Sequence, residues 1–333
     1  MTNEKLNIAV VYSHHKLGDL IWQLPYIKSI SDHYNSKVTL IVRPKTQAKD
    51  ILKDEGYIDD FFYCKFRKKL WYFIEVFILY LFFRKKKFTH VFILDKISRP
   101  AIAAKLARVN NIIGPGIKSQ KKWLTTKLFL TENDYKNLNY SEQSEKILKF
   151  QKISVKEKIP KINIKKQTLS TIKPNINEEK KYVSLGVDSF ELYKMWFEEQ
   201  FAELANKFHE NRIAEKFFLI ASPDNSNIVK KIIDLSGRDI FYDCSKLNLL
   251  QVIKVIKNSI FFVGNNSGPL NLASALQVNA YGLIGNAKVS ELTNSNIKPI
   301  LPPSYENVFK KDRLEMKKIN TQQVYNFITS DLF

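Results

Sequence analysis

Cysteine and histidine are scarce in this chain. Its 333 residues include two cysteines, Cys64 and Cys244, and five histidines that are scattered along the sequence. Two distant cysteines give no disulfide framework and no cysteine metal site, and no His/Glu pair has the spacing of a zinc motif. We therefore expect no resident metal ion.

Glycine is also sparse, with ten residues in the whole chain, and the common glycine motifs are missing. The sequence contains neither G-x-G-x-x-G nor G-x-x-x-x-G-K-[ST], which argues against a standard dinucleotide-binding domain and against a P-loop. It also lacks the G-x-S-x-G nucleophile elbow of the α/β-hydrolases.

Long hydrophobic runs are missing as well. The longest apolar run covers 14 residues, 70–83, and includes Glu75, so it is too short to span a bilayer. The amino terminus, residues 1–6, is polar and shows no secretory signal. These features predict a cytoplasmic protein that can rest on the inner face of the cytoplasmic membrane.

The charge of the chain is strongly one-sided. Lys and Arg number 53 against 33 Asp and Glu, which gives a net charge of +20. Such a charge favours anionic partners, among them nucleotides and anionic membrane surfaces. The basic residues are spread along the sequence without an aromatic-interleaved basic motif, so we do not expect nucleic-acid binding.

Apolar runs of strand length alternate with amphipathic segments of helix length, first over residues 7–114 and again over 182–284. This alternation predicts an α/β fold with two Rossmann-like domains, whose parallel sheets face each other across a cleft. We place the domains at 1–165 and 175–320, with a linker near 160–179. Residues 321–333 are predicted as a closing helix that can pack back on the first domain. Pro25 predicts that the helix after the first strand begins late or kinks.

The most distinctive stretch is 265–275, with the sequence NNSGPLNLASA, which follows the apolar run 260–264. A buried strand, a turn with Gly268 and Pro269, and a helix of small residues form a junction whose free N–H groups can bind a phosphate. The same residues also suit an ordinary helix cap. Two further polar segments, 16–19 and 189–196, follow the first strand of each half, where a donor and an acceptor could meet.

Together these segments resemble the lipopolysaccharide heptosyltransferase family of glycosyltransferases, a family 9-like group with a GT-B fold. The resemblance rests on Leu17-Gly18-Asp19 with Pro25, on the Lys194-x-Trp196 pair, and on the block 265–273, in the family's order over about 7–285. It implies an inverting, metal-independent transfer without a cofactor. The donor would be a nucleotide sugar, ADP-linked heptose by default, bound by the second domain. The acceptor, the lipid A core oligosaccharide, would be bound by the first.

The resemblance also implies roles for individual residues. Asp19 matches the general base that takes the proton of the acceptor hydroxyl, and Lys194 matches a lysine that contacts the donor phosphates. A helix N-cap is the structural alternative for Asp19, and a solvated surface position is the alternative for Lys194. The remaining acceptor contacts would be His14, His15, Lys16 and Gly18. The remaining donor contacts would be Ser189, Asp224, Leu247, Asn265, Asn266, Ser267, Gly268, Pro269, Leu270 and Asn271.

The block 265–273 departs from the family at two positions. Asn266 and Asn271 stand where the family has Asp and His, so hydrogen bonding is kept while ionisable groups are lost. The donor could therefore carry a sugar other than heptose, or the protein could bind nucleotide sugars without catalysis.

The aromatic segment 66–87 is flanked by Lys and Arg and allows two interpretations. It can be a core helix of the first domain, or it can lie at a membrane interface with its basic residues on lipid phosphates.

Overall fold

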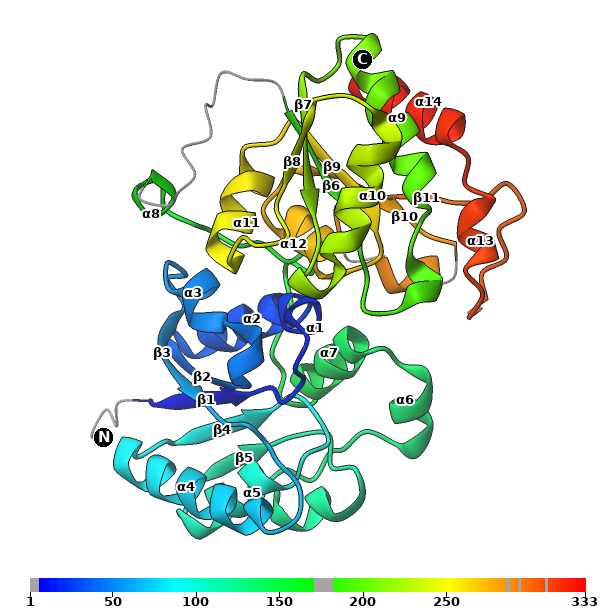
Figure 1. The fold of residues 1–333 in the computed structure, drawn as a ribbon. Coiled ribbons are helices and arrows are strands. Elements are labelled where there is room, and N and C mark those ends of the chain that lie inside the picture. Colours follow the sequence, from blue (N-terminus) through cyan, green and yellow to red (C-terminus); the bar gives the residue numbers. More distant parts are fainter. Residues whose placement is uncertain (1–5, 171–181, 286–287, 293–294, 309–310) are drawn as a thin grey trace. The chain divides into compact units, whose positions relative to one another are not determined.

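The computed structural model describes residues 6–170, 182–285, 288–292, 295–308 and 311–333. The chain divides into two compact units, Met1–Ile164 and Lys165–Phe333. Each unit is a parallel sheet with helices on its faces, as the alternating sequence pattern predicts (Figure 1).

The first unit holds a five-stranded sheet in the order β3-β2-β1-β4-β5, and every pair of neighbours is parallel. Its central strand is buried throughout because apolar residues on both faces contact covering helices. One face is covered by α4 and α5, whose side chains share a core with β1 and β4. The strands are β1 Ile8–Val11, β2 Val38–Val42, β3 Ile58–Tyr63, β4 His90–Ile93 and β5 Asn111–Ile113. The helices are α1 Leu17–Ile21, α2 Leu24–Tyr34, α3 Ala48–Leu52, α4 Trp71–Lys86, α5 Arg99–Leu106, α6 Glu132–Asn137 and α7 Tyr140–Phe150, with 3₁₀ turns η1 Pro44–Thr46 and η2 Lys118–Trp123.

Of the two alternatives predicted at Pro25, a late helix start and a kink, the structure shows the late start. The chain makes the short α1, breaks at Trp22–Gln23, and begins α2 at Leu24 with Pro25 in the first turn. Proline is tolerated there because its missing N–H would have no partner within the helix.

The second unit holds a six-stranded parallel sheet in the order β11-β10-β9-β6-β7-β8. The helices α9, α10 and α14 cover one face, and their apolar side chains share one core with the sheet. The strands are β6 Tyr182–Gly186, β7 Lys216–Ile220, β8 Phe241–Asp243, β9 Phe261–Asn265, β10 Asn279–Leu283 and β11 Ile297–Ile300. The helices are α8 Lys166–Ser170, α9 Glu198–Glu210, α10 Ser226–Ser236, α11 Leu249–Lys257, α12 Gly268–Ala275, α13 Leu314–Lys317 and α14 Thr321–Leu332, with 3₁₀ turns η3 Leu192–Lys194, η4 Pro223–Asn225 and η5 Val289–Leu292.

Two glycines bring β6 and β9 unusually close. A Cβ on Gly264 would lie 2.6 Å from the carbonyl oxygen of Gly186, and a Cβ on Gly186 would lie 2.4 Å from the Phe262 ring. Only glycine fits both positions, and this contact fixes the carboxyl ends of the two strands side by side.

The closing helix corrects one expectation. Val324 and Ile328 of α14 are completely buried in the core of the second unit, and Tyr281 Oη of β10 donates a hydrogen bond of 2.6 Å to Asp331 Oδ2. The helix therefore packs within the second unit, whereas the sequence allowed a return to the first. Of the predicted linker, residues 171–179 lie outside the described part of the chain.

Candidate active site

In the first unit, the candidate residues follow the carboxyl end of β1. Lys16 is the N-cap of α1 and its side chain makes no capping hydrogen bond, while Asp19 lies in the first turn of the helix. The N-cap alternative for Asp19 is therefore wrong. The Asp19 carboxylate is about one-third exposed and lies 3.6 Å from Nδ1 of His14. It is thus an accessible acid group that lies beside an imidazole ring.

His14 is held between two aromatic rings. The Tyr12 ring stacks on its imidazole at 4.9 Å between centroids, and the Tyr140 ring of α7 meets it edge-on at 4.4 Å. Burial raises the pKa of Tyr12 well above its usual range, with the carboxylates of Asp19 and Asp95 acting in the same direction, so the phenol stays neutral. His15 and Lys16 are exposed, and Gly18 is buried in the turn.

Asp95, which the sequence interpretation missed, supports this loop from β4. It is buried, and its carboxylate accepts hydrogen bonds from the backbone N–H groups of Ser13 and, at 3.2 Å, Ile97. Gln120 donates to the carbonyl oxygens of Asp95 and Ile97 at 2.9 and 2.8 Å. An acid directly after a buried strand was the available signal in the sequence.

In the second unit, the segment after β6 carries Ser189 and Lys194. Lys194 Nζ pairs with Glu191 Oε2 at 2.6 Å, and its side chain is about one-fifth exposed. Ser189 is buried and its Oγ accepts a hydrogen bond from the Glu191 N–H at 3.4 Å. Lys194 is thus a half-buried lysine whose ammonium pairs with a carboxylate three residues before it.

Asn265, the last residue of β9, is occupied by contacts within the protein. It is fully buried, its Oδ1 accepts a hydrogen bond from the Trp196 N–H at 2.8 Å, and its Nδ2 donates to the Val187 carbonyl at 3.0 Å. Through these two hydrogen bonds, its amide holds both ends of the segment 187–196 against the end of β9. We assign it a positioning role in place of the direct donor contact that the resemblance implies.

In the described part of the chain, two side-chain oxygen atoms in the first turn of α12 have no hydrogen-bond partner. Ser267 is the N-cap with an extended backbone, yet its side chain makes no capping hydrogen bond. Ser267 Oγ and Asn271 Oδ1 are both buried and have no hydrogen-bond partner among the described residues. A Cβ on Gly268 would meet no atom within 4 Å, so space is open at this turn. A site for a polar ligand needs polar atoms without partners, free N–H groups and open space, and this turn combines all three.

The other candidates of the second unit follow neighbouring strands. Asp224 is exposed in η4 after β7, and Leu247 is half-buried after β8. Asn266 and Pro269 are half-buried at the start of α12, where Leu270 is buried. Because β9, β6, β7 and β8 are adjacent in that order, all donor candidates lie along one sheet edge.

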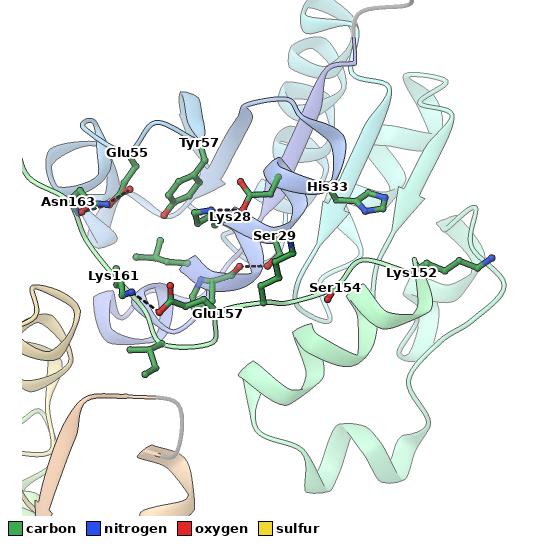
Figure 2. Close-up of a pocket in the computed structure, with 15 residues that line it drawn as sticks. Lys28, Ser29, His33, Glu55, Tyr57, Lys152, Ser154, Glu157, Lys161 and Asn163 are labelled. Carbon is green, nitrogen blue, oxygen red and sulfur yellow. Dashed lines mark hydrogen bonds and ion pairs between the residues drawn. The ribbon is translucent and has the colours of Figure 1, made fainter.

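A separate cavity of about 510 Å³ lies in the first unit, between α2 and the segment 152–163 (Figure 2). None of the predicted site residues lines it. Several of its charged side chains neutralise one another: Lys28 pairs with Asp32, and Lys161 Nζ lies 2.7 Å from Glu157 Oε1. Glu55, whose pKa is raised by burial, accepts a hydrogen bond from the Asn163 N–H at 2.6 Å. This cavity offers no arrangement for sugar transfer.

Metal-ligand side chains do not cluster in the described residues. No group of three or more His, Cys, Asp or Glu in this part of the chain is placed to hold a metal ion. Both cysteines are buried, which raises the pKa of Cys64 to about 11 and that of Cys244 to about 12.

The chain matches the family model of glycosyltransferase family 9 (heptosyltransferase) over residues 136–323. No curated protein matches its sequence. Its fold resembles a family 9 glycosyl transferase from Veillonella parvula, with a TM-score of 0.76, 17% identity, and coverage of 99% of this chain and 98% of that chain. It also resembles the E. coli ADP-heptose lps heptosyltransferase II, with a TM-score of 0.76, 14% identity and coverage of 98% of both chains.

A third similar structure is E. coli heptosyltransferase WaaC with ADP-2-deoxy-2-fluoro heptose. Its TM-score is 0.75 at 16% identity, with coverage of 98% of this chain and 100% of that chain. At such identities the likeness establishes the fold, and the predicted GT-B type of α/β architecture is confirmed.

Proposed function

Because the chain belongs to glycosyltransferase family 9, the heptosyltransferase family, we propose that it transfers a sugar from a nucleotide-sugar donor to a lipopolysaccharide core acceptor. The transfer would invert the anomeric centre and need no metal ion. The observation that carries the proposal is the accessible Asp19 carboxylate in the first turn of α1, just after β1 and 3.6 Å from Nδ1 of His14, in a chain of this family.

In the proposed reaction, Asp19 accepts the proton of an acceptor hydroxyl as that oxygen attacks the anomeric carbon of the donor. The new glycosidic C–O bond forms while the bond from the anomeric carbon to the diphosphate oxygen breaks. The electron pair of that bond leaves with the nucleoside diphosphate. Attack opposite to the leaving group inverts the anomeric centre in one displacement.

The departing diphosphate would be stabilised by cationic and N–H groups of the second unit. Lys194 supplies a positive charge, and the free N–H groups at the start of α12 supply fixed partial charges. Ser267 Oγ, which has no hydrogen-bond partner among the described residues, lies beside them and can donate to a phosphate oxygen. Since Lys194 is already paired with Glu191, donor binding would shift its ammonium from the carboxylate toward the phosphates.

The proposed donor is an ADP-linked heptose, which is the family default, and the similar WaaC structure contains an ADP-linked fluoro heptose. A second candidate is a donor with a different sugar, because Asn266 and Asn271 stand where the family has Asp and His. The buried Oδ1 of Asn271 has no partner within the described residues and would accept a hydrogen bond from a sugar hydroxyl. A ligand that fills this position must therefore present a donor group to it.

We place the proposed reaction at the inner face of the cytoplasmic membrane, where a lipid-linked acceptor would be met. The net charge of +20 supports peripheral contact with an anionic surface. In the described residues, no helix combines the length and the apolar character needed to cross a bilayer.

A donor panel with a lipid A–inner core acceptor tests this proposal. Nucleoside diphosphate release and product mass would be measured with ADP-heptose, with other ADP-sugars, and with GDP- and UDP-sugars, each with and without EDTA. We expect acceptor-dependent release with ADP-heptose that EDTA leaves unchanged. Preference for another sugar would refute the heptose assignment alone. Donor binding without acceptor-dependent release from any nucleotide sugar would identify a non-catalytic binding protein.

A further inference from the structure

The helix α4 is anchored to the first unit along one stripe only. Val76, Leu79 and Phe83 of this stripe are buried in the core with α5 and the sheet. Glu75 is buried beside them and pairs with Arg99, and its Oε2 accepts a hydrogen bond from the Arg67 N–H at 2.9 Å. The core interpretation of segment 66–87 is thus correct for this stripe.

The opposite side of α4 exposes large apolar side chains. Their exposed fractions run from 37% to 73%, and they recur at spacings of three and four residues, which places them on one side of the helix. A contiguous apolar surface of this kind is rare on a protein that has no partner there. The exposed apolar residues are Leu70, Trp71, Phe73, Ile74, Phe77, Ile78 and Leu81.

Basic side chains flank this apolar surface at both ends of the helix. Lys68 and Lys69 are exposed before its first turn, and Arg84 and Lys85 are exposed after Leu81 on the same side. The one acidic residue in the stretch 65–87 is Glu75, which is buried and paired. The apolar surface therefore has a purely cationic rim along this stretch.

A hollow of about 500 Å³ adjoins the carboxyl end of α4. Arg84, Lys87 and Arg108 line it together with the polar side chains of Thr89 and Asn110. Lys86 does not contribute to the rim, because its ammonium pairs with Asp60 at 2.7 Å. Three guanidinium and ammonium groups around one hollow suit a phosphate-bearing headgroup.

We propose that α4 is a peripheral docking surface for anionic phospholipid. The 16 residues of α4 extend for about 24 Å, and the helix would lie in the plane of the bilayer interface. Its exposed apolar side chains enter the acyl boundary, and Lys68, Lys69, Arg84, Lys85 and Lys87 contact lipid phosphates. Two copies of the chain that met through this face would bring their cationic rims together, so charge repulsion opposes a dimer there. Figure 1 shows α4 beside α5 on one face of the first sheet.

Vesicle flotation with the full chain tests this inference. The inference gives a specific site for the proposed membrane contact and does not depend on the proposed reaction. The assay therefore contains no donor and no acceptor. The probes are vesicles of phosphatidylcholine alone and of phosphatidylcholine mixed with phosphatidylglycerol. We expect binding to the mixed vesicles and loss of that binding as salt concentration rises.

Two variants separate the ionic and the apolar contributions. Arg84→Glu/Lys85→Glu/Lys87→Glu should weaken binding to the mixed vesicles by about 100-fold or more, because each basic residue near the surface contributes about 1 kcal/mol. Phe73→Ser/Phe77→Ser/Leu81→Ser should weaken it as well, and these exposed positions leave the core unchanged. Lys37→Glu/Lys53→Glu/Lys230→Glu is the matched control, since it changes net charge equally at exposed lysines elsewhere and should keep most of the binding.

The inference is overturned if both α4 variants bind the mixed vesicles like the unmodified chain. It is also overturned if the unmodified chain does not bind either type of vesicle and instead forms a dimer. That dimer would be detected by light scattering and would be lost in Phe73→Ser/Phe77→Ser/Leu81→Ser. All variants should bind the donor as the unmodified chain does. The vesicle assay contains no donor and no acceptor, so its result can be interpreted even if the proposed reaction is not observed.

Discussion

At the scale of single residues, the nearest described contact of the Asp19 carboxylate with a ring is that with His14, and we expect this contact to influence its orientation. The imidazole lies 3.6 Å from the carboxylate and is fixed by the rings of Tyr12 and Tyr140. A general base acts only when it lies within hydrogen-bond reach of the proton it removes, so its orientation bears directly on turnover.

Replacement of His14 tests this positioning role. We expect His14→Ala to lower kcat about 10- to 100-fold, because Asp19 loses its oriented neighbour. His14→Gln should lose less, since an amide at this position can donate a hydrogen bond to the carboxylate. Steady-state kinetics with saturating donor, together with donor affinity by calorimetry, would separate the effects. Equal kcat values for His14→Ala and the unmodified chain would show that Asp19 needs no support from this ring.

Candidate site residues could be proposed from the sequence only where a short, continuous motif marks them. Asp19 and Lys194 were proposed from short motifs that follow recognisable strands and resemble those of the family, and their roles stay predictions. The contact of His14 with Tyr140 and the ties from Asn265 to Val187 and Trp196 join residues far apart in the sequence. Such contacts depend on packing that no local pattern encodes, so the hydrogen bonds of the Asn265 amide could not be predicted.

At the scale of elements, Arg313 links the segment before α13 to the Lys194 segment. Its Nε donates to the Met195 carbonyl at 3.1 Å, and its Nη2 donates to the Trp196 carbonyl at 3.3 Å. The guanidinium is itself held by Glu198 Oε1 at 3.2 Å. Despite its burial, Glu198 has a pKa lowered by Lys231 and Arg313, so it stays charged at neutral pH.

We expect Arg313→Ala to weaken donor binding about 10-fold, because the segment that carries Lys194 loses two hydrogen bonds of about 1 kcal/mol each. Arg313→Lys should restore only part of the donor affinity, since an ammonium cannot reproduce the planar guanidinium with its several N–H donors. Arg238→Ala is the matched control, because its ion pair with Glu210 lies on the exposed surface. Calorimetric titration with ADP measures the effect, and unchanged affinity in Arg313→Ala would rule out this positioning role.

The position of α14 gives a prediction for stability. Ile328 is completely buried in the core of the second unit, so Ile328→Ala should cost about 2–4 kcal/mol of unfolding free energy. Phe333→Ala, at a residue that is 91% exposed, should change it by less than about 0.5 kcal/mol. Urea unfolding followed by circular dichroism measures both values. Similar midpoints for the two variants would mean that α14 contributes little to this core.

Elements with a clear hydrophobic period were predictable, and elements at the edge of a sheet were not. The strand β11 was missed because Pro299 interrupts its short sequence, and proline is tolerated there because β11 is the last strand of its sheet. The helix α14 was recognised, yet its apolar face does not specify which core it joins. The exposed apolar side of α4 was likewise undetermined, because a helix that is apolar all round gives no periodic signal.

At the scale of the whole molecule, two successive alternations of strand and helix were enough to predict two parallel-sheet units. The division between Ile164 and Lys165 follows from contacts within each unit. Each unit brings its candidate residues to the carboxyl edge of its own sheet, which is where open α/β sheets bind ligands. The proposed division of labour is therefore one unit for the base and another for the donor.

The central claim is that Asp19 is the base of a glycosyl transfer, and the most direct test is the turnover of Asp19→Asn. Acceptor-dependent release of nucleoside diphosphate should fall about 100- to 10,000-fold, while the affinity for ADP should stay unchanged, because we propose that the other unit binds the donor. The matched control is Asp50→Asn, an exposed carboxylate in the first turn of α3, which should keep full turnover. Near-normal turnover by Asp19→Asn would contradict the account.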